Sequence, residues 1–172
     1  MTSGFPTGRS AWFALSVRPR HEQTIAEHLR LKGLEPFAPS YREPRRWSDR
    51  VRQVEVNLFP GYVFCKLAYE NRLEVLNIPS VTSIVGFGRQ AAPVPEEEID
   101  TIRTALGSGM PVRPWPYLKA GQKVRIEEGA LAGVEGTLAR EKDACRVIIN
   151  IELLQRSIAV EIDRELLRAV RQ

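Results

Sequence analysis

Two segments in the first half of the chain, residues 12–17 and residues 62–67, repeat their side-chain character with the two-residue period of a β-strand. The apolar faces consist of Phe13, Leu15 and Val17 in the first segment and of Val63, Cys65 and Leu67 in the second. Because successive side chains of a strand point to opposite faces, Tyr62, Phe64 and Lys66 share the other face. Two aromatic side chains on that face indicate either a docking surface or a sheet that is packed on both sides.

Two further segments repeat their apolar side chains with the helical period of 3.6 residues. The first follows Pro19 and ends at Gly33, and the second begins after Pro95 and ends at Gly107. Their apolar faces are formed by Ile25, Ala26 and Leu29 in the first helix and by Ile99, Ile102 and Leu106 in the second. Three glutamates at the start of the second helix suit the positive end of the helix dipole better than a metal cluster. Strands and helices in this order predict an α+β layer in which helices cover a sheet.

The character of the chain changes at residues 108–117, where three prolines in ten residues oppose regular structure. This segment is predicted to be an extended linker. Beyond it, residues 118–172 contain short β-branched or alternating stretches at residues 124–126, 147–151 and 157–162, with glycine turns between them. Short strands with glycine corners predict a small all-β barrel as the second domain.

Length and composition fit two small globular domains. Residues 1–10 lack the apolar core of a secretory signal and are expected to be a disordered lead, so that the first domain spans residues 11–107. No apolar run approaches the roughly 20 residues of a membrane helix. Cys65 and Cys145 lie far apart and outside any CxxC pair. This spacing argues against a metal or redox motif and suits a reducing cytoplasm.

The net charge of +4 is modest, but the positive charge is concentrated. Five arginines crowd the segment around Trp47: Arg42, Arg45, Arg46, Arg50 and Arg52. Glu43 and Asp49 offset them there. Arginines with an interleaved aromatic side chain can neutralise phosphates and stack a base. We therefore hypothesise a nucleic-acid contact through Arg45, Arg46 and Arg50, and the alternative is a solvated, arginine-rich hairpin.

Two motifs resemble those of a known family. Residues 59–62, Phe-Pro-Gly-Tyr, resemble the signature of the N-terminal (NGN) domain of NusG-type transcription elongation factors. Residues 124–136 resemble the KOW motif that opens their C-terminal barrel. The resemblance implies an α+β fold, in which an NGN-type α/β sandwich with an antiparallel sheet is followed by an SH3-like KOW β-barrel. Ribosomal proteins also carry KOW motifs, so a ribosome-associated RNA-binding protein is the alternative.

Within this family the chain resembles the UpxY-like branch, which is related to RfaH and implies antitermination in long operons for surface polysaccharides. The similarity lies in residues 44–50 and residues 151–161. The resemblance implies contact with the clamp helices of bacterial RNA polymerase through Trp12, Phe59, Tyr62 and Phe64. It also implies contact with the non-template DNA strand through Arg18, His28 and Lys32, with Arg20 nearby. A histidine on a helix is, however, more often an ordinary surface residue.

The barrel of this family recruits a ribosomal protein or the Rho terminator, partly through aromatic side chains at positions that Leu131 and Leu154 occupy here. These two departures weaken the expectation of either partner. The sequence shows no nucleophile elbow, metal-ligand spacing or phosphate-binding glycine loop. We therefore expect a binding protein rather than an enzyme, with no cofactor and no metal. It is expected to act as a monomer in the cytoplasm.

Overall fold

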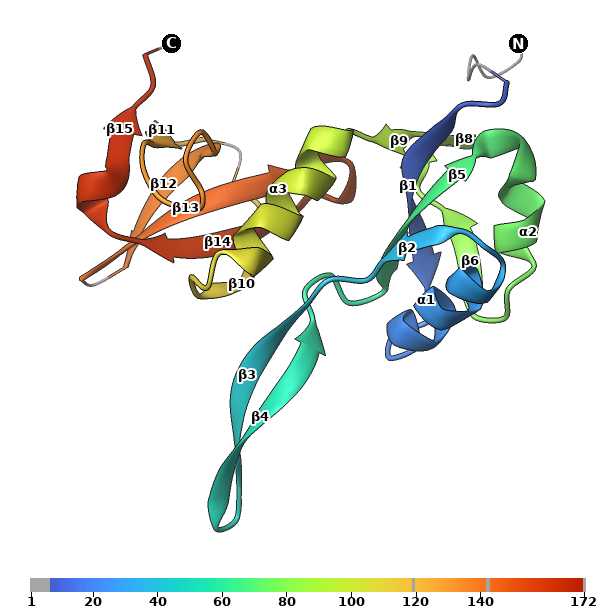
Figure 1. The fold of residues 1–172 in the computed structure, drawn as a ribbon, viewed down its shortest axis with the longest axis horizontal. Helices are drawn as coiled ribbons and strands as arrows, with labels where there is room; N and C mark the ends of the chain where they lie inside the picture. Colours follow the sequence, from blue (N-terminus) through green and yellow to red (C-terminus); the bar gives the residue numbers. More distant parts are fainter. Residues whose placement is uncertain (1–6, 119, 142, 172) are drawn as a thin grey trace. The chain divides into compact units, whose positions relative to one another are not determined.

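The computed structural model describes residues 7–118, 120–141 and 143–171, and the chain divides into two compact units (Figure 1). The first unit ends at Glu96 and the second begins at Glu97. Of the expected lead, residues 1–6 lie outside the described residues, and Ser10 is already the first residue of a strand. The two units are described separately below.

The first unit is built on an antiparallel sheet whose strands run in the order β2-β5-β1-β6, with β9 also paired to β1 (Figure 1). These strands are β1 (Ser10–Val17), β2 (Glu35–Phe37), β5 (Tyr62–Ala68), β6 (Val81–Ile84) and β9 (Pro93–Val94). The two alternating segments of the sequence are neighbours in this sheet, because β1 pairs with β5 in the register Phe13↔Cys65 and Leu15↔Val63. Residues directly opposite each other in such a pair share a face.

One face of this sheet is the hydrophobic core that the alternation predicts. It packs against α1 (Glu22–Leu31) and α2 (Arg72–Leu76). The buried cluster comprises Phe13, Leu15, Val17, Ile25, Leu29, Val63, Cys65, Leu67, Val75 and Ile78. The predicted end of the first helix is also confirmed, because Gly33 follows α1 with a φ of 76°, the left-handed conformation in which glycine is favoured. A short 3₁₀ turn, η1 (Tyr69–Asn71), precedes α2.

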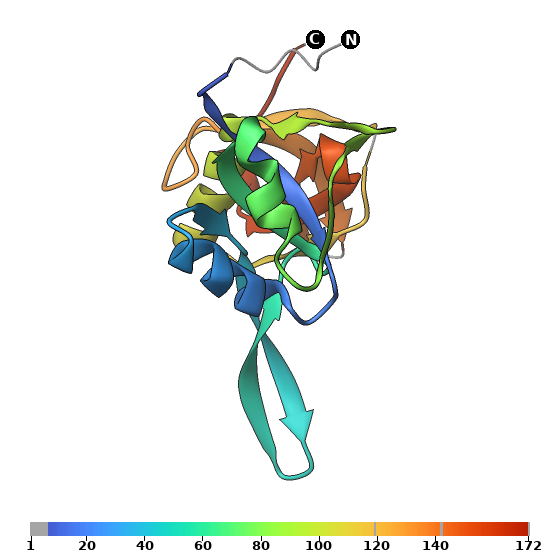
Figure 2. The ribbon, with the colours of Figure 1, turned by 90° about the vertical axis from the view of Figure 1, so that its right-hand side faces the viewer.

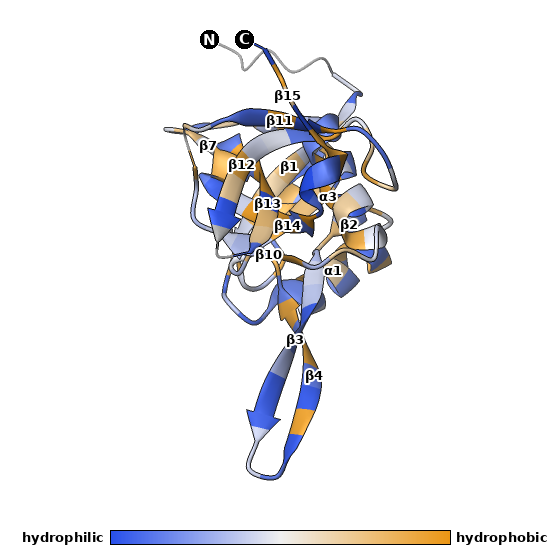
Figure 3. Cartoon of the chain, turned by 90° about the vertical axis from the view of Figure 1, so that its left-hand side faces the viewer, coloured by the Kyte–Doolittle hydropathy of each residue, from blue (hydrophilic) through white to orange (hydrophobic). Residues whose placement is uncertain are grey.

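Two hairpins belong to the first unit. The longer one pairs β3 (Ser40–Trp47) with β4 (Arg50–Asn57), and it extends away from the rest of the unit (Figure 2). It forms a two-stranded sheet of its own, and most of its length is hydrophilic (Figure 3). The shorter one pairs β7 (Gly86–Phe87) with β8 (Gln90–Ala91). The arginine-rich segment of the sequence therefore forms the outer part of the long hairpin.

The second unit consists of a helix and an all-β sheet with the strand order β10-β14-β13-β12-β11-β15. Its elements are α3 (Glu96–Gly107), β10 (Val112–Trp115), β11 (Lys123–Ile126), β12 (Glu135–Glu141), β13 (Ala144–Ile151), η2 (Glu152–Leu154), β14 (Arg156–Ile162), η3 (Arg164–Leu166) and β15 (Leu167–Ala169). The predicted β-branched stretches supply the interior, with Val147, Ile151, Ile158 and Val160 fully buried. The all-β character expected of this part is confirmed.

The segment predicted to be an extended linker contains a strand. Val112–Trp115 forms β10 and pairs with β14, with Val112 opposite Val160 and Pro114 opposite Ile158. Proline is tolerated there because β10 is an edge strand, where a missing backbone N–H leaves no ladder hydrogen bond broken on the open side. The helix over residues 96–107, expected in the first domain, is assigned to the second unit apart from Glu96. The chain divides into its two compact units between Glu96 and Glu97.

Candidate functional site

The face of the first sheet opposite its main core carries a cluster of aromatic rings. Phe64 of β5 lies 5.6 Å from Phe59 in an edge-to-face arrangement and 6.1 Å from Phe37, measured between ring centroids. Trp12 of β1 lies 6.5 Å from Phe37, also edge to face. Such pairs stabilise by about 0.5–1.5 kcal/mol each beyond the area that they bury. The cluster makes this face a rigid aromatic layer.

The structure places the four predicted polymerase-binding residues on this face or beside it, but exposes them unequally. Trp12, Phe59 and Phe64 are at most 3% exposed, whereas Tyr62 is half-buried. The sequence left open whether this sheet is packed on both sides. At Trp12 and Phe64 it is, because both side chains are buried on the face opposite the main core. Of the four side chains, Tyr62 is the one that the surface presents. Lys66, four residues after Tyr62 on the same face of β5, is half-buried and contacts Glu96 at 2.9 Å.

A buried carboxylate connects the aromatic face to the base of the long hairpin. Glu22, at the start of α1, is 1% exposed. Its Oε1 accepts a hydrogen bond from the backbone N–H of Gly61 at 2.8 Å, and its Oε2 accepts one from Asn57 Nδ2 at 2.9 Å. Gln23 Nε2 donates to Asn57 Oδ1 and to the Ala38 carbonyl, both at 3.2 Å. These bonds hold α1, the turn at Gly61 and the ends of the hairpin together.

Sequence reasoning missed this role of Glu22. A signal was present, because Glu22 lies three residues before Ile25 and seven before Leu29, on the apolar face of α1. Residues at these spacings share one side of a helix. A polar side chain on the buried side of a helix requires hydrogen-bond partners, which the sequence alone does not locate.

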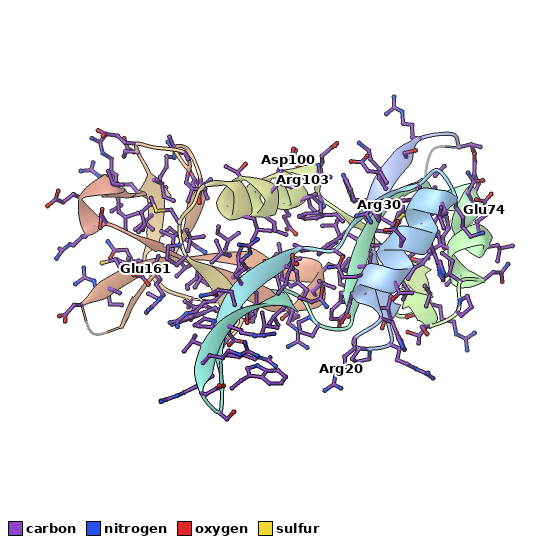
Figure 4. The ribbon with its side chains drawn as sticks, turned by 60° about the horizontal axis from the view of Figure 1, so that its bottom comes forward. Arg20, Arg30, Glu74, Asp100, Arg103 and Glu161 are labelled. Carbon is purple, nitrogen blue, oxygen red and sulfur yellow. The ribbon has the colours of Figure 1, made fainter. Side chains whose placement is uncertain are left out.

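Four of the residues predicted for DNA contact lie at the two ends of α1. Arg18 and Arg20 lie in the exposed loop before the helix, and His28 and Lys32 are exposed at its far end. Figure 4 shows Arg20 pointing away from the ribbon at that loop. A ten-residue helix is about 15 Å long, so the structure separates these four residues into two pairs. His28 and Lys32, four residues apart, lie on one side of the helix.

The long hairpin divides its arginines between its two faces. The register places Arg45 opposite Arg52 and Trp47 opposite Arg50. Since directly opposite residues share a face, these four side chains lie together. Arg46 pairs with Val51 and points to the other face, as does Arg42, which pairs with Glu55. All five arginines are exposed, and Trp47 is 62% exposed.

The loop before α1 and the hairpin meet at one recess. Arg20 and Arg45 both line it, together with Pro19, Glu22, Val54, Glu55, Val56, Asn57 and Pro60, and its volume is about 500 Å³. Arg20 holds a left-handed backbone conformation with a φ of 70°. Arg45 also contacts Glu43 at 3.5 Å. The recess thus brings together two cationic segments that the sequence treats as separate.

Leu131 and Leu154, the residues that the resemblance placed at the partner-binding surface of the barrel, are buried inside the second unit. Leu131 is 2% exposed. Neither side chain is presented to a partner in this structure. Both act as core residues, because burial removes their apolar side chains from water.

The second unit also contains an unusual carboxyl group, which sequence reasoning took only as a helix-dipole residue. Glu98 of α3 is half-buried, and its Oε2 is enclosed with no hydrogen-bond partner among the described residues. The pKa of Glu98 is raised to about 7, chiefly by burial and then by the nearby carboxylate of Glu152, while a hydrogen bond with the backbone of Glu152 acts in the opposite direction. The hydroxyl of Tyr117 donates a hydrogen bond to Glu152 Oε2.

Other chemistry finds little support in the described parts of the chain. Among these residues no three His, Cys, Asp or Glu side chains are grouped as metal ligands would be. Cys65 is buried, and its burial raises the pKa of the thiol to about 12, which disfavours the reactive thiolate. Within the described residues, no helix combines the length and the apolar character needed to cross a bilayer.

Comparisons with known proteins agree with this architecture. The family model described as "Transcription termination factor nusG" matches residues 10–103, more than half of the chain. The transcription termination/antitermination protein NusG of Lactococcus lactis subsp. lactis is 28% identical over 167 residues, covering 88% of this chain and 89% of that protein. Its counterpart in Vibrio parahaemolyticus is 26% identical over 154 residues, covering 84% and 85%.

A solved structure is similar in fold. It is described as domain interaction in Thermotoga maritima NusG, and it matches with a TM-score of 0.55 and 21% sequence identity. The match covers 95% of this chain and 98% of that one. The NGN-type sheet with its helices and the all-β second part are therefore shared with it. On the strength of the family model, this chain belongs to the NusG family of transcription termination factors.

Proposed function

We propose that the protein is a transcription elongation and antitermination factor that binds RNA polymerase through its first unit. The observation that carries this proposal is the aromatic layer around Phe64, at whose edge Tyr62 reaches the surface. Aromatic side chains with rigid surroundings are frequent centres of protein interfaces. Relatives that match most of the chain are named termination/antitermination proteins, which supports the same activity.

The proposed partner of this face is the pair of clamp helices of the polymerase. Tyr62 is well positioned for such a contact, because its backbone N–H donates to the Phe59 carbonyl at 3.1 Å and it pairs with Ser16 of β1. Because these bonds fix the backbone that carries the side chain, little backbone ordering is required on binding. The rings of Trp12, Phe59 and Phe64 are buried. They would support the surface that carries Tyr62 and would not contact the polymerase directly.

A second contact is proposed with the exposed non-template DNA strand. Its candidate residues are exposed basic side chains: Arg18, Arg20, His28, Lys32, Arg45, Arg46 and Arg50. Arginine and lysine bind phosphates without reading the sequence. Because the recess brings Arg20 and Arg45 together, the loop before α1 and the hairpin can act on the same strand.

The mechanism requires no chemical step. A protein that holds the clamp and the DNA together binds the closed, elongating state of the polymerase better than the opened state that permits pausing. Such differential binding shifts the population toward the closed state, and pausing and termination decrease. A contribution of 1.4 kcal/mol to this difference changes the ratio of the two states about tenfold.

We further propose a specialised role of the UpxY-like and RfaH-related kind, in long operons such as those for polysaccharide synthesis. The arginine-rich hairpin supports it, because the similarity to that branch lies partly in this segment. Recruitment of a ribosomal protein or of Rho by the barrel remains part of the proposal. Since Leu131 and Leu154 are buried, that contact would have to use other side chains of the second unit.

The test is transcription in vitro with purified bacterial RNA polymerase on a template that carries a pause site and a terminator. The full chain is expected to bind the polymerase, shorten the pause and raise readthrough. Binding to purified small ribosomal subunits is measured in parallel. Binding to ribosomal subunits with neither polymerase binding nor a change in readthrough would overturn the proposal in favour of a ribosome-associated RNA-binding protein.

A further inference from the structure

The two faces of the long hairpin differ in chemistry, although the sequence groups its arginines together. We call the face that carries Trp47, Arg45, Arg50 and Arg52 the tryptophan face, as the strand register defines it. The other face carries Arg42, Arg46, Val51 and Glu55. We propose that the tryptophan face binds one unpaired strand of nucleic acid and that the other face does not. This inference rests on the proposed function and assigns the DNA contact of the hairpin to one surface, which removes Arg46 from the candidate residues and adds Arg52.

Trp47 indicates an unpaired strand. It is the last residue of β3, beside the two-residue turn, and it is 62% exposed although it is among the largest apolar side chains of the chain. An exposed aromatic ring can stack on a base only where that base has left its own stack, as in single-stranded DNA or RNA. Arg50 lies directly opposite it, where a guanidinium can reach the adjoining phosphate. The tip of the hairpin thus offers one stacking ring and one cation.

The strand would continue from the tip toward the base of the hairpin. Arg45 and Arg52 lie two residues from Trp47 and Arg50 along their strands, which is about 7 Å at 3.4 Å per residue. The carboxylate that β3 and β4 place on this face is Glu43, one further step toward the base, where it contacts Arg45. The cationic surface is therefore strongest in the outer half of the hairpin.

Arg20 extends this surface onto the body of the first unit. It lines the recess of about 500 Å³ together with Arg45 and Val54, and Val54 belongs to the tryptophan face. Glu22 fixes the geometry, because its bonds to Asn57 and Gly61 hold the hairpin base against α1. Arg45, Val54 and Val56 of the tryptophan face line the recess, and Glu55 and Asn57 of the other face complete it at the hairpin base. Arg20 thus lies beside Arg45, and the proposed track runs from Trp47 past Arg45 to Arg20.

The hairpin offers a matched pair of variants. Arg45→Gln with Arg52→Gln removes two charges from the tryptophan face, and Arg42→Gln with Arg46→Gln removes two from the other face. Binding of a fluorescent 15-residue oligothymidylate to the full chain is measured by anisotropy at several salt concentrations. The first variant should bind at least tenfold more weakly, with a log–log salt slope shallower by about 1.4. The second should stay within twofold of the parent. Equal losses in both variants would overturn the assignment of one face.

A second set of measurements tests the stacking and the track. Trp47→Ala should weaken oligothymidylate binding about 5- to 150-fold, the equivalent of one stacked base, and Trp47→Phe should retain most of it. Arg20→Gln should reduce the salt slope, whereas Arg30→Gln, on α1, should not. A blunt 15-base-pair duplex that binds as tightly as the single strand, with no effect of Trp47→Ala, would overturn the proposal of an unpaired strand.

Polymerase binding is measured on the same variants, so that the inference and the proposed function can fail separately. Loss of oligothymidylate binding in Arg45→Gln/Arg52→Gln with unchanged polymerase affinity is the expected result. Absence of polymerase binding in every variant and in the parent would refute the proposed function, while the difference between the two faces would still stand. Circular dichroism and the thermal midpoint check that the hairpin variants fold as the parent does.

Discussion

The carboxylate of Glu22 accepts a hydrogen bond from the backbone N–H of Gly61, 39 residues further along the chain, at 2.8 Å. The two residues join the start of α1 to the turn that leads into β5. Gly61 has a φ of 84°, which only glycine adopts readily. Because the same carboxylate also binds Asn57 at the end of the hairpin, one buried side chain positions both proposed contact surfaces relative to α1.

Glu22→Gln should lower the free energy of unfolding of the protein by about 2 kcal/mol. The amide that replaces the carboxyl group has one acceptor oxygen, so one of the two donors, the Gly61 N–H or Asn57 Nδ2, is left without its acceptor, and a buried donor without a partner costs about 1–3 kcal/mol. Urea denaturation measures the change. Glu27→Gln, on the exposed side of the same helix, is the control and should change stability by less than about 0.5 kcal/mol. Equal effects of the two variants would contradict the role of Glu22.

Tyr62→Ala should reduce the affinity of the full chain for the polymerase clamp helices about 30-fold. A central aromatic side chain of an interface commonly contributes 2 kcal/mol or more on truncation. Titration with an isolated clamp-helix fragment measures the affinity. Tyr117→Ala removes a half-buried tyrosine of the second unit and should leave the affinity unchanged. An unchanged affinity of Tyr62→Ala would remove this residue from the interface.

The stability of the second unit should fall as the pH rises from about 4.5 to about 7. In that window folded Glu98, with its pKa raised to about 7, retains a proton that the unfolded chain has already lost. Protonation therefore stabilises the folded state below the window, and the gain is lost as the pH rises through the folded pKa. Glu98→Gln should remove this part of the pH dependence, and Glu97→Gln should not. Denaturation at pH 5 and pH 7.5 measures the change in stability, and the carboxyl ¹³C shift of Glu98 as a function of pH measures its pKa. A titration midpoint of Glu98 near 4.5 would contradict the expectation.

Charge removal at the two ends of α1 should separate the DNA contact from the polymerase contact. Arg18→Ala with Lys32→Ala should lower readthrough of a terminator and leave clamp-helix affinity unchanged, because both side chains are exposed and neither lies on the aromatic face. Glu27→Ala with Arg30→Ala removes an exposed ion pair of the same helix at no change in net charge and serves as the control. If the Arg18 and Lys32 variant retains full readthrough, the contact belongs to the hairpin alone.

Much of the fold follows from local patterns that the structure confirms. The period of two in residues 12–17 and 62–67 identified the core face of β1 and β5. Successive side chains of a strand point to opposite faces, so every second side chain lies on the same face. The helix ends at Gly33 and Gly107 followed from glycine and charge signals. The two motifs of the resemblance led to the family that the comparisons establish.

The exposure of the sheet face that carries Trp12 and Phe64 could not be predicted from local patterns. Alternation states that Trp12 and Phe64 point away from the core, but whether that face is wet or covered depends on residues distant in sequence, such as Phe37 and Phe59. The same holds for β10. Proline excludes a central strand but permits an edge strand, and only the pairing with β14 shows which case applies.

The sequence by itself determined which side chains share a face within each element and which segments are cationic or aromatic, because these depend on the backbone period and on composition alone. The tertiary structure decided which of those faces are exposed and which distant residues meet. Arg45 and Arg46 are neighbours in sequence, yet the register of the hairpin places them on opposite faces. Glu22 and Gly61 are far apart in sequence, yet packing of α1 on the sheet brings them into hydrogen-bond contact. Register and packing arise from contacts along the whole unit, and no local pattern contains them.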